Sequence, residues 1–134
     1  IAVGLDLTDR ERQSSLKREQ LPWSRAKCFK GSAIVGEFSN WAGKISDLCD
    51  DSSGLILCLK VNDEVRQKEK LSAMTIKPEA QIESLLKWAP LQAGDYIFTG
   101  TPSGVEQLFA GDSVLASLET VDGVVISSIE TICE

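Results

Sequence analysis

The pattern of apolar and polar positions near the start of the chain predicts a strand followed by a helix. The run IAVGL at residues 1–5 is apolar and partly β-branched, which favours a strand. Thr8 and Glu11 have the spacing of a capping box, so we expect a helix from about Asp9. It should end near Gln20, because Pro22 cannot continue a helix.

Short apolar runs in the middle of the chain alternate with turn residues. A loop is expected over residues 23–30. Residues 39–54 are polar and acidic, which indicates a solvated connection without chemistry of its own. The pair Asn62-Asp63 predicts a hairpin turn. The apolar runs around these segments predict strands over residues 32–38, 55–61 and 65–67.

The last third of the chain predicts one amphipathic helix and a final hairpin. Ile82, Leu85 and Leu86 have helical spacing, so we expect a core-facing helix from Pro78 to Ala89. Asp122-Gly123 is the signal for a two-residue hairpin turn. The strands predicted here cover residues 96–99, 113–121 and 124–132. Strands outnumber helices without regular βαβ alternation, so the fold class is α+β, mostly β, with a mostly antiparallel or mixed sheet.

Length and charge limit the organisation of the chain and its partners. At 134 residues we expect a single domain spanning residues 1–134. A net charge of −6 provides no positive field for phosphate backbones, so nucleic acid is not an expected partner. No apolar run approaches the ~18 residues that a membrane span needs, and the start lacks the features of a secretory leader. We therefore expect a cytoplasmic protein without a membrane partner.

The cysteine and histidine content excludes several kinds of active site. The four cysteines form no CxxC pair and are expected to be reduced thiols, mostly in the core. The chain has no histidine, which removes Ser-His-Asp and Cys-His arrangements and the commonest zinc ligand. Any catalysis must therefore use carboxylate, lysine, hydroxyl or a hard metal ion.

A few polar residues lie where chemistry is feasible, and each also has a purely structural interpretation. Asp6 lies where a strand gives way to a helix, which suits an anion-stabilising site or a simple turn. Arg10 and Gln13 share a helix face that could equally be solvated. Lys27 follows Trp23, where an aromatic ring could shield an ammonium, although a lysine there is also typical of a surface. Gly100-Thr101-Pro102-Ser103-Gly104 lets the backbone approach a ligand, or is a tight structural loop.

Taken together, several strings of the sequence resemble the fumarylacetoacetate hydrolase family in their order and spacing. They are LDLTDRERQ, LPWSRAKCF, VNDEVRQ and LQAGDYIFTGTPSGV, followed by a late GD. The nearest branch holds acylpyruvases, oxaloacetate decarboxylases and hydroxymuconate isomerases. The resemblance implies an α+β fold built as a mixed β-sandwich roll, a homodimer, and Mg²⁺ or Mn²⁺ held by three carboxylates. The expected substrates are small 2,4-dioxo or β-keto acids of the acylpyruvate, oxaloacetate or hydroxymuconate type.

The resemblance also assigns roles to individual residues. Asp6 matches one of the metal carboxylates. Arg10 and Gln13 match the residues that hold the substrate's carboxylate and oxo groups. Lys27 matches the active-site lysine, which binds substrate and takes part in catalysis. The loop residues that match the backbone amide and hydroxyl meeting the substrate are Gly100 and Thr101, with Thr101 also catalytic.

One departure from the family pattern leaves two hypotheses open. The family's other two metal carboxylates form a Glu-x-Glu pair upstream of Asp6, and this chain contains no such pair. The chain opens on Ile1 rather than Met, so we expect a fragment or processed chain lacking the N-terminal part. The first hypothesis is a metal-dependent hydrolase, lyase or isomerase that works through a metal-stabilised enolate, with a weak or incomplete metal site in this chain alone. Its compartment is an organelle matrix if a targeting segment was removed. The second is a truncated, non-catalytic relative that acts as a dimerisation or small-anion binding module.

Overall fold

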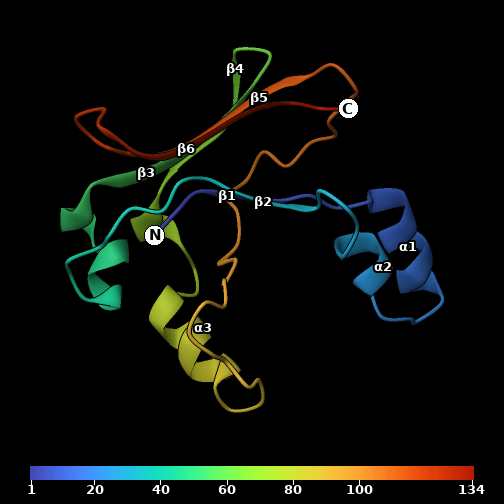
Figure 1. Ribbon diagram of the computed structural model, residues 1–134, viewed down its shortest axis with the longest axis horizontal. Helices are drawn as coiled ribbons and strands as arrows, with labels where there is room; N and C mark the ends of the chain where they lie inside the picture. Colours follow the sequence, from blue (N-terminus) through green and yellow to red (C-terminus); the bar gives the residue numbers. More distant parts are fainter.

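Two antiparallel sheets form the framework of the chain, and a computed structural model describes all of its residues, 1–134. β1 (Gly4–Asp6) pairs with β2 (Ala33–Val35) in a two-stranded sheet. The larger sheet has the strand order β4-β3-β5-β6. Its strands are β3 (Leu55–Val61), β4 (Glu64–Lys70), β5 (Ser113–Thr120) and β6 (Val125–Ile132). Figure 1 shows the small sheet beneath the large one, with the helices further below or at the side. The predicted α+β class, mostly β, is confirmed.

Both predicted hairpins are present in the larger sheet. Asn62 and Asp63 join β3 to β4 with φ of 50° and 66°, the two positive values that a type I′ turn requires. The β5–β6 turn passes through Gly123, whose φ is 82°. The backbone N–H of Thr120 donates to the carbonyl of Val124 (2.9 Å), so three residues close this loop instead of the predicted two. A third loop residue with left-handed backbone is a common alternative to the two-residue turn.

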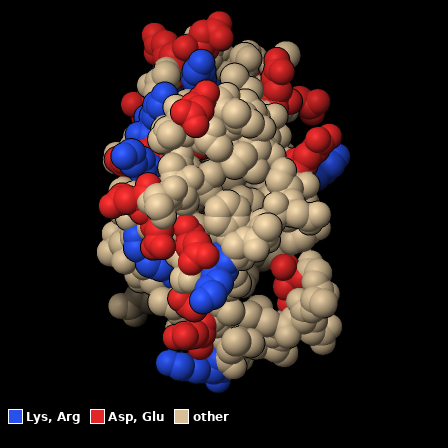
Figure 2. Space-filling model, turned by 90° about the vertical axis from the view of Figure 1, so that its left-hand side faces the viewer, with Lys and Arg blue, Asp and Glu red and all other residues tan.

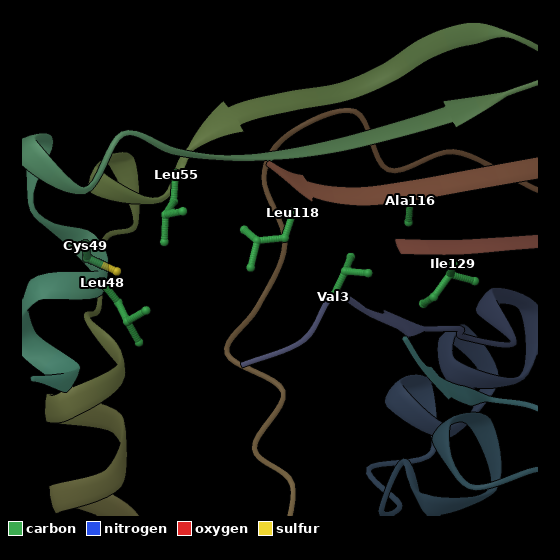
Figure 3. Close-up of a cluster of buried hydrophobic side chains, with 7 residues drawn as sticks. All are labelled: Val3, Leu48, Cys49, Leu55, Ala116, Leu118 and Ile129. Atoms are coloured by element: carbon green, nitrogen blue, oxygen red, sulfur yellow. The ribbon is translucent and has the colours of Figure 1, made fainter. Parts of the chain in front are cut away.

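The core lies between the two sheets. It contains Val3 from the start of the chain, Leu55 from β3, two residues of β5 and one of β6, as Figure 3 shows with Leu48 and Cys49. In β5, Val114, Ala116 and Leu118 alternate with more exposed residues and face the same side. The backbone N–H of Val3 donates to Ser127 Oγ of β6 (3.0 Å). This contact ties the segment leading into β1 to the large sheet.

The first helix, α1 (Arg10–Arg18), is predicted correctly except for its cap. Asp9 is the cap residue, and its Oδ1 accepts a hydrogen bond from the backbone N–H of Arg12 (2.9 Å). The Thr8 hydroxyl does not cap the helix, because Thr8 lies one residue earlier and accepts from Lys27 instead. The helix stops before Gln20, whose φ of 56° is left-handed.

Two segments expected to be loops contain short helices. α2 (Ser24–Lys27) lies within the predicted loop 23–30. The predicted solvated connection 39–54 contains the 3-10 helices η1 (Ile45–Cys49) and η2 (Asp51–Ser53). Leu48 and Cys49 are buried in the core, so the prediction of a solvated connection is wrong at these two residues. Most residues of this segment are polar, but Leu48 and Cys49 are apolar and pack in the core.

The strand predicted over residues 96–99 is absent. The carbonyl of Thr99 accepts from Gln81 Nε2 (3.0 Å), a side chain of α3 (Pro78–Leu85), so it takes a side-chain donor in place of a strand partner. α3 itself lies within the predicted 78–89 and has no fully buried residue. Of the three residues that predicted a core-facing helix, Ile82 and Leu85 are half-buried and Leu86 is 61% exposed, so the prediction is wrong at Leu86. A further short 3-10 helix, η3 (Leu71–Ala73), follows β4.

All four cysteines are free, as expected, but only half of them lie in the core. Cys49 and Cys58 are buried, Cys133 is half-buried and Cys28 is exposed. Burial raises the pKa of the Cys49 and Cys133 thiols, so both stay protonated at neutral pH. None of the helices is long and apolar enough to cross a lipid bilayer.

Candidate active site

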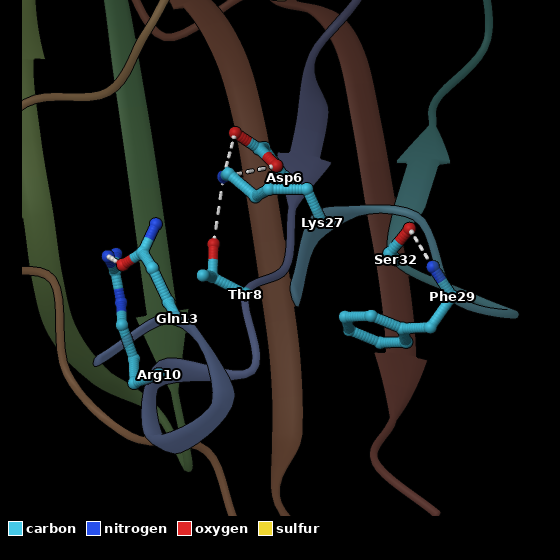
Figure 4. A network of polar contacts seen from close by, with 7 residues as sticks. All are labelled: Asp6, Thr8, Arg10, Gln13, Lys27, Phe29 and Ser32. Atoms are coloured by element: carbon cyan, nitrogen blue, oxygen red, sulfur yellow. Dashed lines mark hydrogen bonds and ion pairs between the residues drawn. The ribbon is translucent and has the colours of Figure 1, made fainter. Parts of the chain in front are cut away.

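Three polar side chains meet where β1 leads into α1. Lys27 Nζ donates to Asp6 Oδ1 (2.8 Å), to Asp6 Oδ2 (2.7 Å) and to Thr8 Oγ1 (2.9 Å), as Figure 4 shows. Asp6 is the last residue of β1 and Lys27 is the last residue of α2. An ammonium group has three hydrogens, so the donors of Lys27 are fully used by these two residues.

Backbone contacts on either side of this cluster fix its geometry. The backbone N–H of Leu7 donates to the carbonyl of Ser32 (2.7 Å), and that of Asp9 donates to the carbonyl of Ala26 (3.1 Å). Ala26 is completely buried, so the residue next to Lys27 cannot move without opening the packing. The connection between β1 and α1 therefore holds Lys27 in place through main-chain bonds as well as through its charge.

The cluster of Asp6, Thr8 and Lys27 remains open to solvent. The Lys27 side chain is 33% exposed and that of Asp6 is 53% exposed. An ion pair with this exposure contributes about 0–1 kcal/mol to stability, because water screens it. The ammonium is thus a positioned cation that an anionic oxygen could reach at small cost to the fold.

Arg10 and Gln13 form a second polar pair on α1. Arg10 Nη1 donates to Gln13 Oε1 (3.0 Å), which confirms that the two residues share one face of the helix. Figure 4 shows both side chains extending from the start of α1 on the side of Thr8. No hydrogen bond joins this pair to Asp6 or Lys27.

The loop Gly100–Gly104 lies against β4. Gln67 Nε2 donates to Thr101 Oγ1 (2.9 Å) and to the carbonyl of Pro102 (2.8 Å). At Gly104, φ is 94° and an added Cβ would lie 2.1 Å from the carbonyl oxygen of Arg66. Gly100 also has a positive φ, 108°. Glycine at both ends is therefore required by the backbone conformation and, at Gly104, by the close approach to β4.

One contact relates this loop to the Asp6 cluster. A Cβ added to Gly4 would lie 2.8 Å from Phe98 Cε1, so Phe98 packs directly over β1. Gly4 and Phe98 each precede a candidate site residue, Asp6 and Gly100, by two positions. In Figure 1 the orange segment that follows α3 crosses β1. No hydrogen bond or ion pair joins Thr101 to Asp6.

The residues of this chain do not by themselves fit the divalent metal ion that the resemblance implies. No group of three His, Cys, Asp or Glu side chains lies close enough together to hold one. Both carboxylate oxygens of Asp6 lie within 2.8 Å of Lys27 Nζ. Mg²⁺ demands several oxygen ligands in near-octahedral geometry, and a single carboxylate supplies too few.

Two contributors to the site were not among the predicted residues. The sequence pattern predicts that Thr8 belongs to a capping box, whereas its contact with Lys27 depends on where α2 packs. Gln67 is the one buried residue of β4, 8% exposed in a strand that is otherwise accessible. Gln67 ends the string VNDEVRQ, and the sequence pattern assigns it no role of its own. A polar residue at a buried strand position is the signal that points to it, and burial is visible only in the fold.

The family model described as fumarylacetoacetate (FAA) hydrolase C-terminal matches residues 1–130. Among curated relatives, a mitochondrial oxaloacetate tautomerase of Mus musculus is 38% identical over 124 residues, 92% of this chain and 52% of the relative. The chain spans about half the length of the curated relatives it matches.

Solved structures give the same picture. A yeast fumarylacetoacetate hydrolase family protein superposes with a TM-score of 0.89 at 29% identity, covering 99% of this chain and 54% of that one. A fumarylpyruvate hydrolase from Pseudomonas aeruginosa, solved in complex with Mn²⁺ and pyruvate, gives a TM-score of 0.79 at 28% identity, with 99% and 54% coverage. These similarities confirm the fold predicted from the resemblance to the fumarylacetoacetate hydrolase family.

Proposed function

The chain belongs to the fumarylacetoacetate hydrolase family, and we propose that it contributes to an active site for small 2,4-dioxo or β-keto acids. The observation that carries the proposal is the Lys27 ammonium, held beside Asp6 and Thr8 and still open to solvent. The curated relatives named as oxaloacetate tautomerases and the fumarylpyruvate hydrolase structure both support an oxo-acid substrate. Core residues from Val3 to Ile129 support one domain over residues 1–134.

In this proposal the cationic groups bind and stabilise an anionic substrate. Breaking a bond next to a carbonyl, by loss of a proton or of a carbon substituent, moves an electron pair onto the carbonyl oxygen and leaves an enolate. Lys27, once it releases one oxygen of Asp6, and the Thr101 hydroxyl donate to the developing negative oxygen. Arg10 and Gln13 hold the substrate's carboxylate and oxo groups. The backbone amide of Gly100 also donates to the substrate. A preorganised donor aimed at such an oxygen contributes about 2.7 to 4 kcal/mol to catalysis.

We also propose that Asp6 is one ligand of a divalent ion, Mg²⁺ or Mn²⁺, whose remaining ligands come from outside these 134 residues. The Mn²⁺ in the fumarylpyruvate hydrolase structure supports a divalent ion. A bound ion would supply Lewis-acid polarisation of the substrate's oxygens. The contacts at Asp6 imply that Lys27 must release at least one carboxylate oxygen for the ion to bind.

The test is turnover of oxaloacetate and an acylpyruvate with Mg²⁺ or Mn²⁺, by the chain alone and together with an upstream segment that supplies a Glu-x-Glu pair. Loss of the enol absorbance of oxaloacetate reports tautomerisation, and pyruvate release reports cleavage or decarboxylation. We expect turnover only when the Glu-x-Glu pair is supplied, and loss of metal binding in Asp6→Asn. Absence of turnover in the completed protein would contradict the proposal.

The second candidate function is a non-catalytic module for dimerisation or small-anion binding. It is favoured by the occupation of both Asp6 oxygens by Lys27 and by the lack of any three-carboxylate group. Binding of oxalate by the chain alone, without metal and without turnover in the completed protein, would support it. In both cases we propose a homodimer in the cytoplasm or an organelle matrix.

A further inference from the structure

Gln67 is a buried polar side chain whose hydrogen bonds all go to one loop. It is 8% exposed, in the strand β4, and the loop it contacts is Gly100–Gly104. Its Nε2 donates to Pro102 O (2.8 Å) and Thr101 Oγ1 (2.9 Å), with a longer contact to Ser103 O (3.3 Å). Both hydrogens of the Gln67 side-chain amide therefore have acceptors in the loop, and these bonds fix the position of the amide.

The partners fix which end of the Gln67 amide faces the loop. Carbonyl oxygens only accept hydrogen bonds, so the two carbonyl contacts require the nitrogen end there. Its two hydrogens go to the two nearest oxygens, Pro102 O and Thr101 Oγ1. The Thr101 oxygen therefore serves as an acceptor for Gln67.

In this arrangement the hydroxyl hydrogen of Thr101 makes only one long hydrogen bond. Its nearest acceptor is Gln67 Oε1 at 3.3 Å, longer than the usual O–H···O distance of about 2.7 to 2.8 Å. Thr101 is exposed, so an oxygen approaching from solvent can take that hydrogen at a shorter distance. The side chain is thereby oriented as a donor.

We propose that Gln67 is a positioning residue, which holds the Gly100–Gly104 loop on β4 and orients the Thr101 hydroxyl as a donor toward a substrate oxygen. The inference rests on the proposed function, in which Thr101 meets the substrate. The close approach of Gly104 to Arg66 O fixes the far end of the loop. Gln67 fixes the near end, at the residue that carries the hydroxyl.

The kinetic test is made in the completed protein, with its Glu-x-Glu segment. It compares Gln67→Leu and Gln67→Glu with a matched control, Gln107→Leu, which changes an exposed glutamine of the following segment in the same way. We expect kcat to fall about 10- to 100-fold in Gln67→Leu, because small misplacement of a reacting group costs up to about 10²-fold. KM should change less than kcat, and Gln107→Leu should match the wild type. A KM increase with unchanged kcat would overturn the proposal.

Gln67→Glu separates orientation from packing. An ionised carboxylate only accepts, so it cannot donate to Thr101 or Pro102, whereas a protonated carboxyl regains one donor. The ratio of variant to wild-type kcat should therefore rise as pH falls. The neighbouring charges are Arg66 and Lys68 on β4 and Glu106, which pairs with Arg66. A pH-independent ratio would overturn the orienting role.

A second measurement, backbone ¹⁵N relaxation of the loop in the full chain, does not depend on turnover. Order parameters over residues 100–104 should fall from about 0.85 toward 0.6 or less in Gln67→Leu and stay unchanged in Gln107→Leu. If the completed protein shows no turnover but Gln67→Leu lowers the order parameters, the proposed function is refuted. The role of Gln67 in fixing the loop is then still supported. Unchanged order parameters would overturn that hold.

Discussion

Lys27 has a structural role and a proposed catalytic role. Its ammonium group binds Asp6 and Thr8, and the same group is the cation proposed to bind the substrate. Its three hydrogen bonds are short, from 2.7 to 2.9 Å, but the side chain of Asp6, which accepts two of them, is 53% exposed. Water screens a pair of this exposure, so the bonds orient the ammonium more than they stabilise the fold. Activity and stability should therefore respond differently to its loss.

We predict that Lys27→Met lowers the turnover of the completed enzyme about 100-fold or more, the effect of removing one preorganised donor. The free energy of unfolding should change by no more than about 1 kcal/mol. Steady-state kinetics and urea denaturation measure the two effects. Lys17→Met, at an exposed position of α1, is the control and should alter neither. A large loss of stability with normal turnover would assign Lys27 a structural role only.

Single residues also show how far the sequence leads toward the site. Asp6, Lys27 and Thr101 could be singled out because their family strings are local. The contact of Lys27 with Asp6 joins residues 21 positions apart and depends on the packing of α2, which sequence patterns did not predict. Gln67 contacts Thr101 across 34 positions, and its burial is a property of the sheet.

At the scale of elements, local signals predict turns well and helix starts less well. The Asn62-Asp63 turn follows from two residues that tolerate positive φ. The cap of α1 is displaced by one residue, because Asp9 and Thr8 both suit a cap and only tertiary contacts draw Thr8 to Lys27. The strand over 96–99 is absent because Phe98 packs on Gly4 and Gln81 bonds Thr99, which are long-range contacts.

We predict that Asp9→Ala lowers the free energy of unfolding by about 1 kcal/mol, the usual cost of losing a cap. The reason is that the backbone N–H of Arg12 loses its acceptor, Asp9 Oδ1. Thr8→Val, which leaves this bond intact, should cost less. Urea denaturation of both variants decides between the two caps. An unchanged free energy of unfolding in Asp9→Ala would show that Asp9 does not cap the helix.

Asp112 joins the β3–β4 hairpin to the start of β5. Its Oδ2 accepts from the backbone N–H of Phe109 (2.7 Å) and its Oδ1 from Asn62 Nδ2 (2.8 Å). Asn62 Oδ1 in turn accepts from the backbone N–H of Ser113 (3.0 Å). The bond from Phe109, followed by that from Asn62, lowers the pKa of Asp112, because both favour the charged carboxylate.

A lowered pKa in the folded state makes this link sensitive to acid. The Asp112 carboxylate contributes fully to stability above the ordinary aspartate pKa of about 3.9. This contribution is lost as the pH falls below that value and through the lower pKa of Asp112 in the folded state. We predict that Asp112→Asn lowers the Tm at pH 7 and that the difference from wild type shrinks as the pH falls below about 3.9. Thermal unfolding followed by circular dichroism measures this. A constant difference across that range would show that the charge is irrelevant.

At the scale of the whole molecule, the chain exposes much more surface than its mass requires. Its accessible surface is 9481 Å², and only 14 of 134 residues are buried. A compact monomer of 14.6 kDa exposes about 6,900 Å². Figure 2 shows a broad uncharged area on one face, with charged side chains gathered mainly toward its edges. Large apolar side chains remain exposed, among them Trp88 at 76% and Tyr96 at 63%.

The excess is about 2,600 Å² for one chain and about 5,200 Å² for two, which lies at the upper end of what a permanent dimer buries. Obligate dimers bury about 2,000 to 5,000 Å² in total, and their contacts are more apolar than those of transient complexes. We predict that sedimentation equilibrium of the chain gives twice the monomer mass of 14.6 kDa at micromolar concentration. The mass should not fall in 1 M NaCl, because salt screens contacts between charges and leaves apolar contacts intact. Dissociation in salt would indicate a charge-driven contact, and a monomer at every concentration would contradict the homodimer.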